Sequence, residues 1–178
     1  FLATTTIPKL SWGLVARPLP MSEMNKLTTC ISRAATDPPN ASKDLRAVFR
    51  GHDTDPLLAV ATANVGAAYR RARRTADGIP TAWTPTRGWA KTLDTHLRRV
   101  GFHGDGPWRW TSDFDTNLHV DLDRTSPTWE PNQQRLLHQL REAWRRQVFH
   151  KWCMSDRPDA LECKTPRYNE ARCKAARG

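Results

Sequence analysis

The chain has 178 residues, which is enough for one domain with a buried core. It contains eight tryptophans and only two tyrosines. Its 28 Lys and Arg against 18 Asp and Glu give a net charge of +10, which is typical of proteins that bind polyanions, most often nucleic acids. The longest weakly polar run, 56–69, is too short for the roughly 20 apolar residues that a membrane span needs. We therefore expect an intracellular protein whose cysteines are reduced.

The first segment, 1–20, begins FLATTTIPKLSWG and carries three prolines. A secretory signal peptide is disfavoured, because a basic leading region is missing and Lys9 interrupts the apolar stretch. We interpret the segment as a seam with an upstream domain. Its apolar residues should then be incompletely buried within this chain, above all Ile7, Leu10 and Trp12.

Two helices are predicted before residue 51. The first covers 22–36, where Ser22 can serve as the N-cap and four apolar residues lie near one face: Met21, Met24, Ile31 and Ala34. Cys30 on this helix is interpreted as a small core residue. A short second helix, 43–50, follows the loop 37–42.

The clearest helix start is TDPLLAV. Asp55 can accept hydrogen bonds from the first backbone N–H groups, and Pro56 fits the first turn. The helix should end near residue 75 in a cluster of arginines, and its buried face should contain Leu58, Ala61, Val65, Ala68 and Ala72.

A Pro/Thr/Gly linker leads to another predicted helix at 85–100, which Gly101 ends. Its apolar stripe consists of Trp89, Leu93, Leu97 and Val100.

The pattern then changes to alternation, which predicts a two-stranded antiparallel hairpin near 107–123 that turns through SDFD. Leu118, Val120 and Leu122 should share one face. Trp108 and Trp110 flank Arg109, and such an arrangement could stack on nucleic-acid bases. Because two alternate strand positions face the same way, we favour burial of both tryptophans in the core.

The longest helix is predicted at 131–152 and should open at Pro131. Its inward face contains Leu137, Leu140, Trp144, Val148 and Trp152, and its outer face contains Arg135, Arg141, Arg145, Arg146 and Lys151. The remaining residues, 153–178, form a loosely ordered basic tail that contains cysteines. The expected fold is therefore mainly α, a helical bundle-like domain over 21–152 with a small antiparallel β-hairpin.

Two sets of residues could hold a metal ion. His150, Cys153, Cys163 and Cys173 have the composition of a zinc site, but their spacing matches no compact zinc pattern, so we favour reduced cysteines and no cofactor. A second acidic set, near the hairpin, could gather a divalent cation and consists of Asp113, Asp115, His119, Asp121 and Asp123. A solvated strand face is the simpler interpretation of that set.

Arginines at helix ends are the best candidates for phosphate contacts, although they also suit the negative end of a helix dipole. The predicted nucleic-acid-binding residues are Arg70, Arg71, Arg73, Arg74, Arg98, Arg99, Arg145 and Arg146. A simple solvated basic face is the alternative.

The order of several segments resembles that of a known family. These segments are TTIPKLSWG, MNKLTTCISRAA, GHDTDPLLAV, GWAKTLDTHLRRVG, GPWRW and LLHQLREAWRRQVFHKW. Together they resemble the region just downstream of the reverse-transcriptase palm in divergent non-LTR retrotransposon polyproteins. The resemblance covers most of the chain and consists of loose patterns.

The resemblance implies a thumb or connection segment, which would hold the phosphate backbone of RNA, DNA or an RNA–DNA hybrid beside an upstream polymerase domain. The family's catalytic box ends in paired aspartates that bind two metal ions, and the sequence contains no Asp-Asp pair. No catalytic residue is therefore expected in this chain. The alternative function is a structural or interaction subunit of a ribonucleoprotein or other large assembly.

Overall fold

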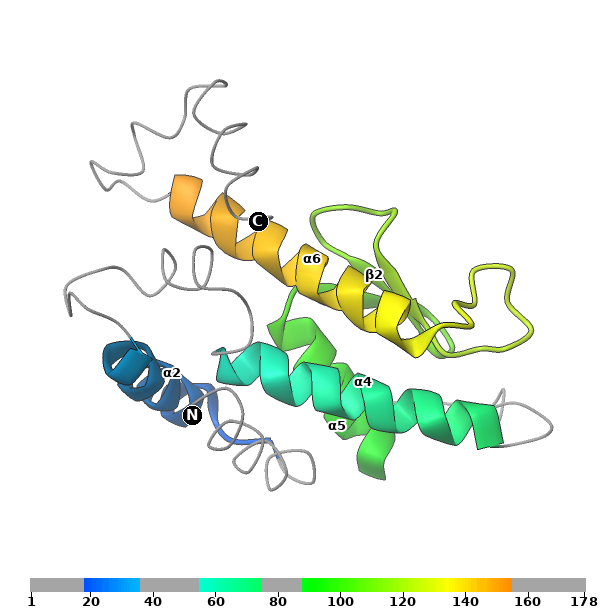
Figure 1. The fold of residues 1–178 in the computed structure, drawn as a ribbon, viewed down its shortest axis with the longest axis horizontal. Coiled ribbons are helices and arrows are strands. Elements are labelled where there is room, and N and C mark those ends of the chain that lie inside the picture. Colours follow the sequence, from blue (N-terminus) through cyan, green and yellow to red (C-terminus); the bar gives the residue numbers. More distant parts are fainter. Residues whose placement is uncertain (1–17, 36–54, 75–87, 155–178) are drawn as a thin grey trace.

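The computed structural model describes residues 18–35, 55–74 and 88–154 (Figure 1). Four helices and three strands lie in these ranges, and the mainly helical class is confirmed. The elements are α2 (Met21–Ala35), α4 (Pro56–Arg74), α5 (Gly88–Arg99), β1 (Phe102–Gly106), β2 (Arg109–Ser112), β3 (His119–Asp121) and α6 (Gln133–Cys153). The predicted seam with Ile7, Leu10 and Trp12, the helix 43–50 and the tail beyond 154 lie outside the described residues.

Helix α4 is at the centre of the packing. It contacts α2, α5 and α6, while α5 also contacts β1 and α6 also contacts β3. In Figure 1, α4 and α6 run one above the other, with α5 behind α4 and the strands behind α6. One hydrophobic core joins these elements, and Leu19 packs against it just before α2.

Helix α2 begins one residue earlier than predicted. The carbonyl of Pro20 accepts hydrogen bonds from the N–H groups of Glu23 and Met24, at 3.1 and 3.0 Å, so Ser22 lies inside the first turn and is not the N-cap. Met24 is buried, as predicted, whereas Met21 is 42% exposed. Cys30 is exposed, so its assignment to the core was wrong.

The start of α4 is confirmed. Oδ1 of Asp55 accepts hydrogen bonds from the N–H groups of Leu57 and Leu58, at 2.8 and 3.3 Å, and an N-cap of this kind stabilises a helix by about 1 kcal/mol. All five residues predicted for its inner face are buried: Leu58, Ala61, Val65, Ala68 and Ala72.

Helix α5 buries Leu93, Leu97 and the adjoining Val100, as predicted. It ends at Arg99, and the turn that follows contains Gly101, which has φ 82°, a left-handed conformation that glycine adopts without strain. Trp89, the predicted first member of the stripe, is instead 38% exposed.

The sheet has one strand more than predicted. The expected hairpin exists as β2 and β3, with Trp110 opposite Val120, and β1 pairs antiparallel on the other side of β2, with Phe102 opposite Ser112. Val120 and Leu122 are fully buried and Leu118 is half-buried.

Helix α6 is capped by Asn132 and not by Pro131. Oδ1 of Asn132 accepts hydrogen bonds from the N–H groups of Gln134 and Arg135, at 2.9 and 3.4 Å. Pro131 has a different role, because its carbonyl accepts a hydrogen bond from the hydroxyl of Tyr69 on α4. The inner face is confirmed for Leu137, Leu140, Trp144 and Val148; the side chain of Trp152 lies outside the described residues.

Candidate nucleic-acid interface

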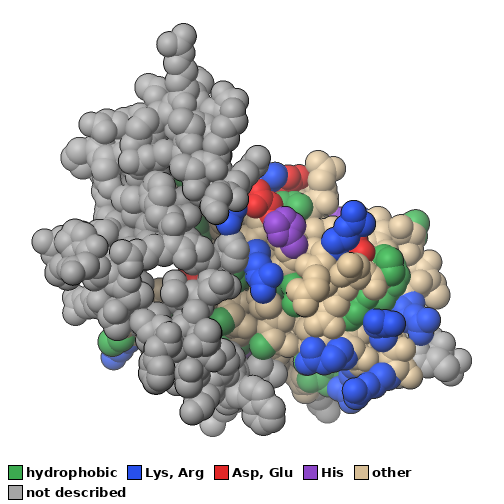
Figure 2. All heavy atoms as spheres, viewed as in Figure 1, with side chains coloured by type: hydrophobic (Ala, Val, Ile, Leu, Met, Phe, Trp, Pro, Cys, Tyr) green, Lys and Arg blue, Asp and Glu red, His purple; other side chains and the backbone are tan. Residues whose placement is uncertain are grey.

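The C-terminal end of α4 carries four exposed arginines, namely Arg70, Arg71, Arg73 and Arg74, which we call the arginine end. Figure 2 shows a group of Lys and Arg side chains at the lower right, where the C-terminal end of α4 lies in Figure 1. Because an α-helix has 3.6 residues per turn, four arginines within five positions surround the end of α4 and do not share one face.

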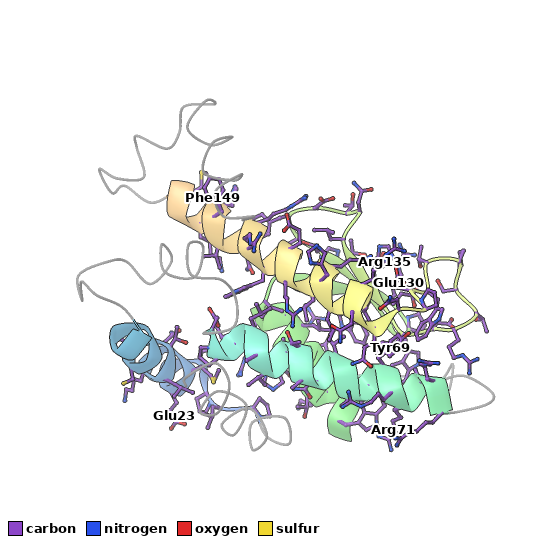
Figure 3. The ribbon with its side chains drawn as sticks, in the orientation of Figure 1. Glu23, Tyr69, Arg71, Glu130, Arg135 and Phe149 are labelled. Atoms are coloured by element: carbon purple, nitrogen blue, oxygen red, sulfur yellow. The ribbon has the colours of Figure 1, made fainter. Side chains whose placement is uncertain are left out.

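The directions of the side chains around α4 confirm this spread. In Figure 3, Tyr69 lies between α4 and the start of α6, whereas Arg71 lies on the opposite side of α4. Arg70 reaches back along the helix, since a Cβ built on Gly66 would lie 3.5 Å from its Nη1. Arg73 is near Tyr69 and opposes the rise in the pKa of Tyr69 that burial causes and Glu130 reinforces.

Ion pairing distinguishes three members of the arginine end from the fourth, Arg71. Within the ranges that the structure describes, no carboxylate forms an ion pair with Arg70, Arg73 or Arg74. A guanidinium presents donors in a planar fork that matches two phosphate oxygens. These three side chains can therefore donate to a polyanion without first breaking an ion pair to a carboxylate of the described residues.

Arg71 is the arginine that contacts an aromatic ring. Its guanidinium carbon lies 5.0 Å from the ring centroid of Trp89, within the range of a cation–π contact. Trp89 in turn stacks on Trp108, with ring centroids 5.2 Å apart and planes inclined by 23°. The sequence predicted Arg71 as a phosphate contact but placed Trp89 in a buried stripe, so this contact between α4 and an exposed tryptophan of α5 was not predicted.

Trp108 and Trp110 are both buried, which confirms the core interpretation for them. Trp108 has φ 62°, and it is the non-glycine residue with positive φ among those described. A left-handed conformation costs a residue with a Cβ about 1–2 kcal/mol. The surrounding packing must offset this cost. Arg109, which lies between the two tryptophans in the sequence, forms an ion pair with Asp105 at 3.5 Å.

The other predicted arginines contact protein groups. Arg98 forms an ion pair with Asp94 at 2.8 Å. Arg99 donates from Nη2 to the carbonyl of Leu19 at 2.7 Å, and burial lowers its pKa. The structure therefore gives Arg99 a role in holding the chain before α2 against α5. Nucleic-acid contact by Arg98 and Arg99 stays a prediction.

Arg145 and Arg146 share one acidic partner on α6. Glu142 lies 3.8 Å from Nη1 of Arg145 and 3.1 Å from Nε of Arg146, and Arg146 also forms an ion pair with Asp115. A phosphate at these two arginines would compete with internal carboxylates, whereas no described carboxylate pairs with Arg70, Arg73 or Arg74.

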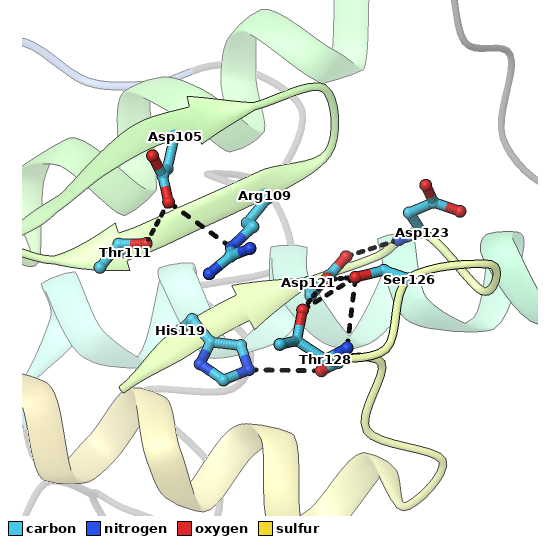
Figure 4. A network of polar contacts seen from close by, with 8 residues as sticks. All are labelled: Asp105, Arg109, Thr111, His119, Asp121, Asp123, Ser126 and Thr128. Atoms are coloured by element: carbon cyan, nitrogen blue, oxygen red, sulfur yellow. Dashed lines mark hydrogen bonds and ion pairs between the residues drawn. The ribbon is translucent and has the colours of Figure 1, made fainter. Parts of the chain in front are cut away.

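The acidic residues of the sheet do not form the predicted solvated face throughout. Asp121 is buried, and its carboxylate accepts hydrogen bonds from the hydroxyls of Ser126 and Thr128 and from the N–H of Asp123 (Figure 4). His119 faces the same loop, with Nε2 3.3 Å from the carbonyl of Thr128. Asp121 therefore organises the loop that follows β3.

The remaining acidic candidates are engaged separately, Asp113 with His103 at 2.7 Å and Asp115 with Arg146. In residues 18–35, 55–74 and 88–154, no group of three or more His, Cys, Asp or Glu side chains is placed to hold a metal ion. Of the zinc candidates, His150 is exposed and its ring lies 5.0 Å from that of Phe114. Cys163, Cys173 and the side chain of Cys153 lie outside the described residues, so zinc stays untested.

The fold and the arginine end define a mainly helical protein with a small antiparallel sheet and a basic helix terminus beside an exposed tryptophan. None of the described helices has the length and apolar character needed to cross a bilayer.

Comparison with known proteins adds one partial likeness. The chain is 35% identical over 83 residues to the tRNA U34 carboxymethyltransferase of Haemophilus influenzae, and the alignment covers 39% of this chain and 26% of that enzyme. The chain thus spans about a quarter of the length of the curated relative that it matches. No protein-family model matches the chain, and no solved structure matches it significantly.

Proposed function

We propose that this chain is a non-catalytic nucleic-acid-binding segment that contacts the phosphate backbone through the arginine end of α4. The observation that carries the proposal is the set of four exposed arginines at one helix terminus, three of which form no ion pair with any described carboxylate. The net charge of +10 adds long-range attraction for a polyanion.

The structure also gives reasons to rank the arginines. Arg98, Arg99, Arg145 and Arg146 each contact a carboxylate or a carbonyl of the chain, so a ligand must compete for them. Within the described part of the chain, no carboxylate pairs with Arg70, Arg73 or Arg74, so a ligand meets no such competition there. The arginine end is accordingly the primary phosphate contact. Arg98, Arg145 and Arg146 contribute less, and the partly buried Arg99 acts mainly on stability.

The wider assignment rests on the family resemblance of the sequence. In that assignment the chain is a thumb- or connection-like segment of a retroelement reverse transcriptase and works beside an upstream polymerase domain. The partial likeness to an enzyme named for tRNA concerns a quarter of that enzyme, and tRNA belongs to the same class of polyanion. The resemblance and the name of that enzyme both involve a nucleic acid, and this agreement supports the proposal.

Binding measured against salt tests the proposal. A variant in which Arg70, Arg71, Arg73 and Arg74 are all changed to Gln should bind RNA, DNA and hybrid duplex more weakly than the native chain. Counterion release predicts a loss of roughly 0.7–0.9 in the slope of log affinity against log salt for each phosphate contact removed. Four lost contacts should therefore lower the slope by about 3.

The control variant removes the same number of charges elsewhere, by changing Lys26, Lys91, Arg141 and Lys151 to Gln. Its binding should fall only through the change in net charge, with a smaller loss of slope. Thermal unfolding of both variants checks that each is folded. Equal effects of the two variants, or native binding that does not depend on salt, would refute the proposal that the arginine end is a specific phosphate contact. Either result would favour the alternative of a structural subunit.

A further inference from the structure

Trp89 combines a large aromatic ring, substantial exposure and a contact with Arg71 of the arginine end. It is 38% exposed although it belongs to an apolar stripe whose other members are fully buried. Burying an indole would remove more apolar surface from water than burying any other side chain. The exposure of Trp89 therefore needs an explanation, and its ring contacts the arginine end through Arg71.

The ring of Trp89 has a fixed support beneath it. Trp108 stacks on it at 5.2 Å, is only 4% exposed, and accepts a hydrogen bond at its carbonyl from the N–H of Leu122 at 2.9 Å. Its left-handed backbone at φ 62° is a conformation that the fold holds against its local preference, and such conformations concentrate at functional sites. The exposed ring of Trp89 therefore lies on a buried, well-packed ring, that of Trp108, which we call the platform.

Arg71 couples this platform to the phosphate-binding surface. Its guanidinium rests 5.0 Å from the ring centroid of Trp89, at the exposed end of a long side chain. A guanidinium and a nucleic-acid base compete for the same aromatic surface, because both stack on it. A phosphate that binds Arg71 can draw the guanidinium off the ring, and a base next to that phosphate can take its place.

Only a strand with unpaired bases can use such a platform. Inside a duplex both faces of a base are covered by the neighbouring base pairs, whereas single-stranded nucleic acid can present its bases to aromatic side chains. We propose that Trp89 stacks on an unpaired base and that the surface made by Trp89 and the arginine end selects single-stranded nucleic acid over duplex. This inference rests on the proposed function.

The test compares three probes: a short single-stranded oligonucleotide, the same strand with abasic residues, and the matching duplex. The main variant is Trp89→Leu, which keeps an apolar contact with Trp108 and removes the aromatic face; Trp89→Phe restores an aromatic ring. Phe114→Leu is the matched control, since Phe114 is another exposed aromatic with the same exposed fraction, 38%.

Trp89→Leu should weaken binding of the single strand by about 5- to 150-fold, the range for one base–aromatic stack, and should leave binding of the abasic strand and the duplex unchanged. Trp89→Phe should retain most of the affinity, and Phe114→Leu should retain all of it. Equal affinity of the native chain for the single strand and its abasic form would overturn the inference, and this result needs no variant to fold.

The two proposals fail in different ways. If the four-arginine variant binds every probe as tightly as the native chain, the proposed function is wrong. If that variant loses binding while Trp89→Leu affects the single strand and the duplex to the same degree, only the stacking inference is wrong. Thermal unfolding of Trp89→Leu separates a loss of binding from a loss of fold.

Discussion

Gly101 and Gln147 approach each other so closely that the site admits no larger residue than glycine without movement. A Cβ built on Gly101 would lie 2.5 Å from Oε1 and 2.6 Å from Cδ of Gln147, whose side chain is buried. The carbonyl of Gly101 also accepts a hydrogen bond from the N–H of Asp113 at 2.9 Å. The approach of Gly101 to Gln147 joins the turn after α5 to α6.

Gly101→Ala should therefore destabilise the protein more than Gly88→Ala. Gly101 and Gly88 have positive φ, 82° and 64°, so either substitution by Ala should cost about 1–2 kcal/mol of stability through backbone strain. A Cβ on Gly88, however, meets nothing within 4 Å. The difference between the two free energies of unfolding, measured in urea, reports the clash with Gln147. A double-mutant cycle with Gln147→Ala should then show coupling, and strict additivity would contradict the contact.

Tyr69→Phe should lower the free energy of unfolding by about 1 kcal/mol, because it removes the hydrogen bond to the carbonyl of Pro131 and leaves that carbonyl without this donor. The ring stack on Trp129, with centroids 4.8 Å apart, should persist. Tyr69→Ala, which also removes the stack, should cost clearly more. Equal losses for the two variants would show that the hydroxyl carries the whole effect.

The same tyrosine should make stability depend on alkaline pH. Burial raises the pKa of Tyr69 above its ordinary value, so the folded state holds this proton more tightly than the unfolded state. The resulting stabilisation is fully present below the unfolded pKa of about 10 and is lost as pH rises through the folded pKa. The difference in stability between the native chain and Tyr69→Phe should shrink over this range and stay constant near neutral pH.

Asp121→Asn should destabilise the protein by about 2 kcal/mol, because hydrogen bonds to a charged group contribute more than neutral ones. The carboxylate accepts from Ser126 and Thr128, and its replacement should also speed proteolysis of the loop after β3. Asp113→Asn is the control: its side chain is 45% exposed and pairs with His103, so the loss should be at most a few tenths of a kcal/mol.

Arg99→Gln should lower stability while leaving the dependence of nucleic-acid binding on salt unchanged. Its guanidinium donates to the carbonyl of Leu19 and is partly buried, so its role is to position the chain before α2. Arg70→Gln should do the opposite, with an unchanged melting temperature and a shallower salt slope. A shallower slope for Arg99→Gln would place it among the phosphate contacts after all.

The helices could be predicted from sequence because their signals are local. The apolar spacing from Leu58 to Ala72 and the Asp55–Pro56 start are read within one element, and both are confirmed. The start of α6 was assigned to Pro131 although Asn132 caps it, since two adjacent residues both favour a helix start and only the backbone geometry distinguishes them.

Features that depend on the tertiary structure could not be predicted in this way. Strand β1 was not predicted, because only Phe102 of its five residues is buried and the strand therefore has no alternating pattern. Asp121 has the character of an exposed strand residue, and only the return of the loop with Ser126 and Thr128 makes its burial tolerable. Likewise, the exposure of Trp89 follows from where α5 meets α4.

The antiparallel sheet with strand order β1-β2-β3 has a consequence for how the chain folds. From α5 through β3, each element packs on its neighbour in sequence, so these contacts close short loops and lose little chain entropy. The contact of Tyr69 with Pro131 closes a loop of 62 residues, so we expect it to form more slowly than the contacts from α5 through β3. We expect Leu97→Ala and Val120→Ala to slow refolding, and Tyr69→Phe to act mainly by speeding unfolding.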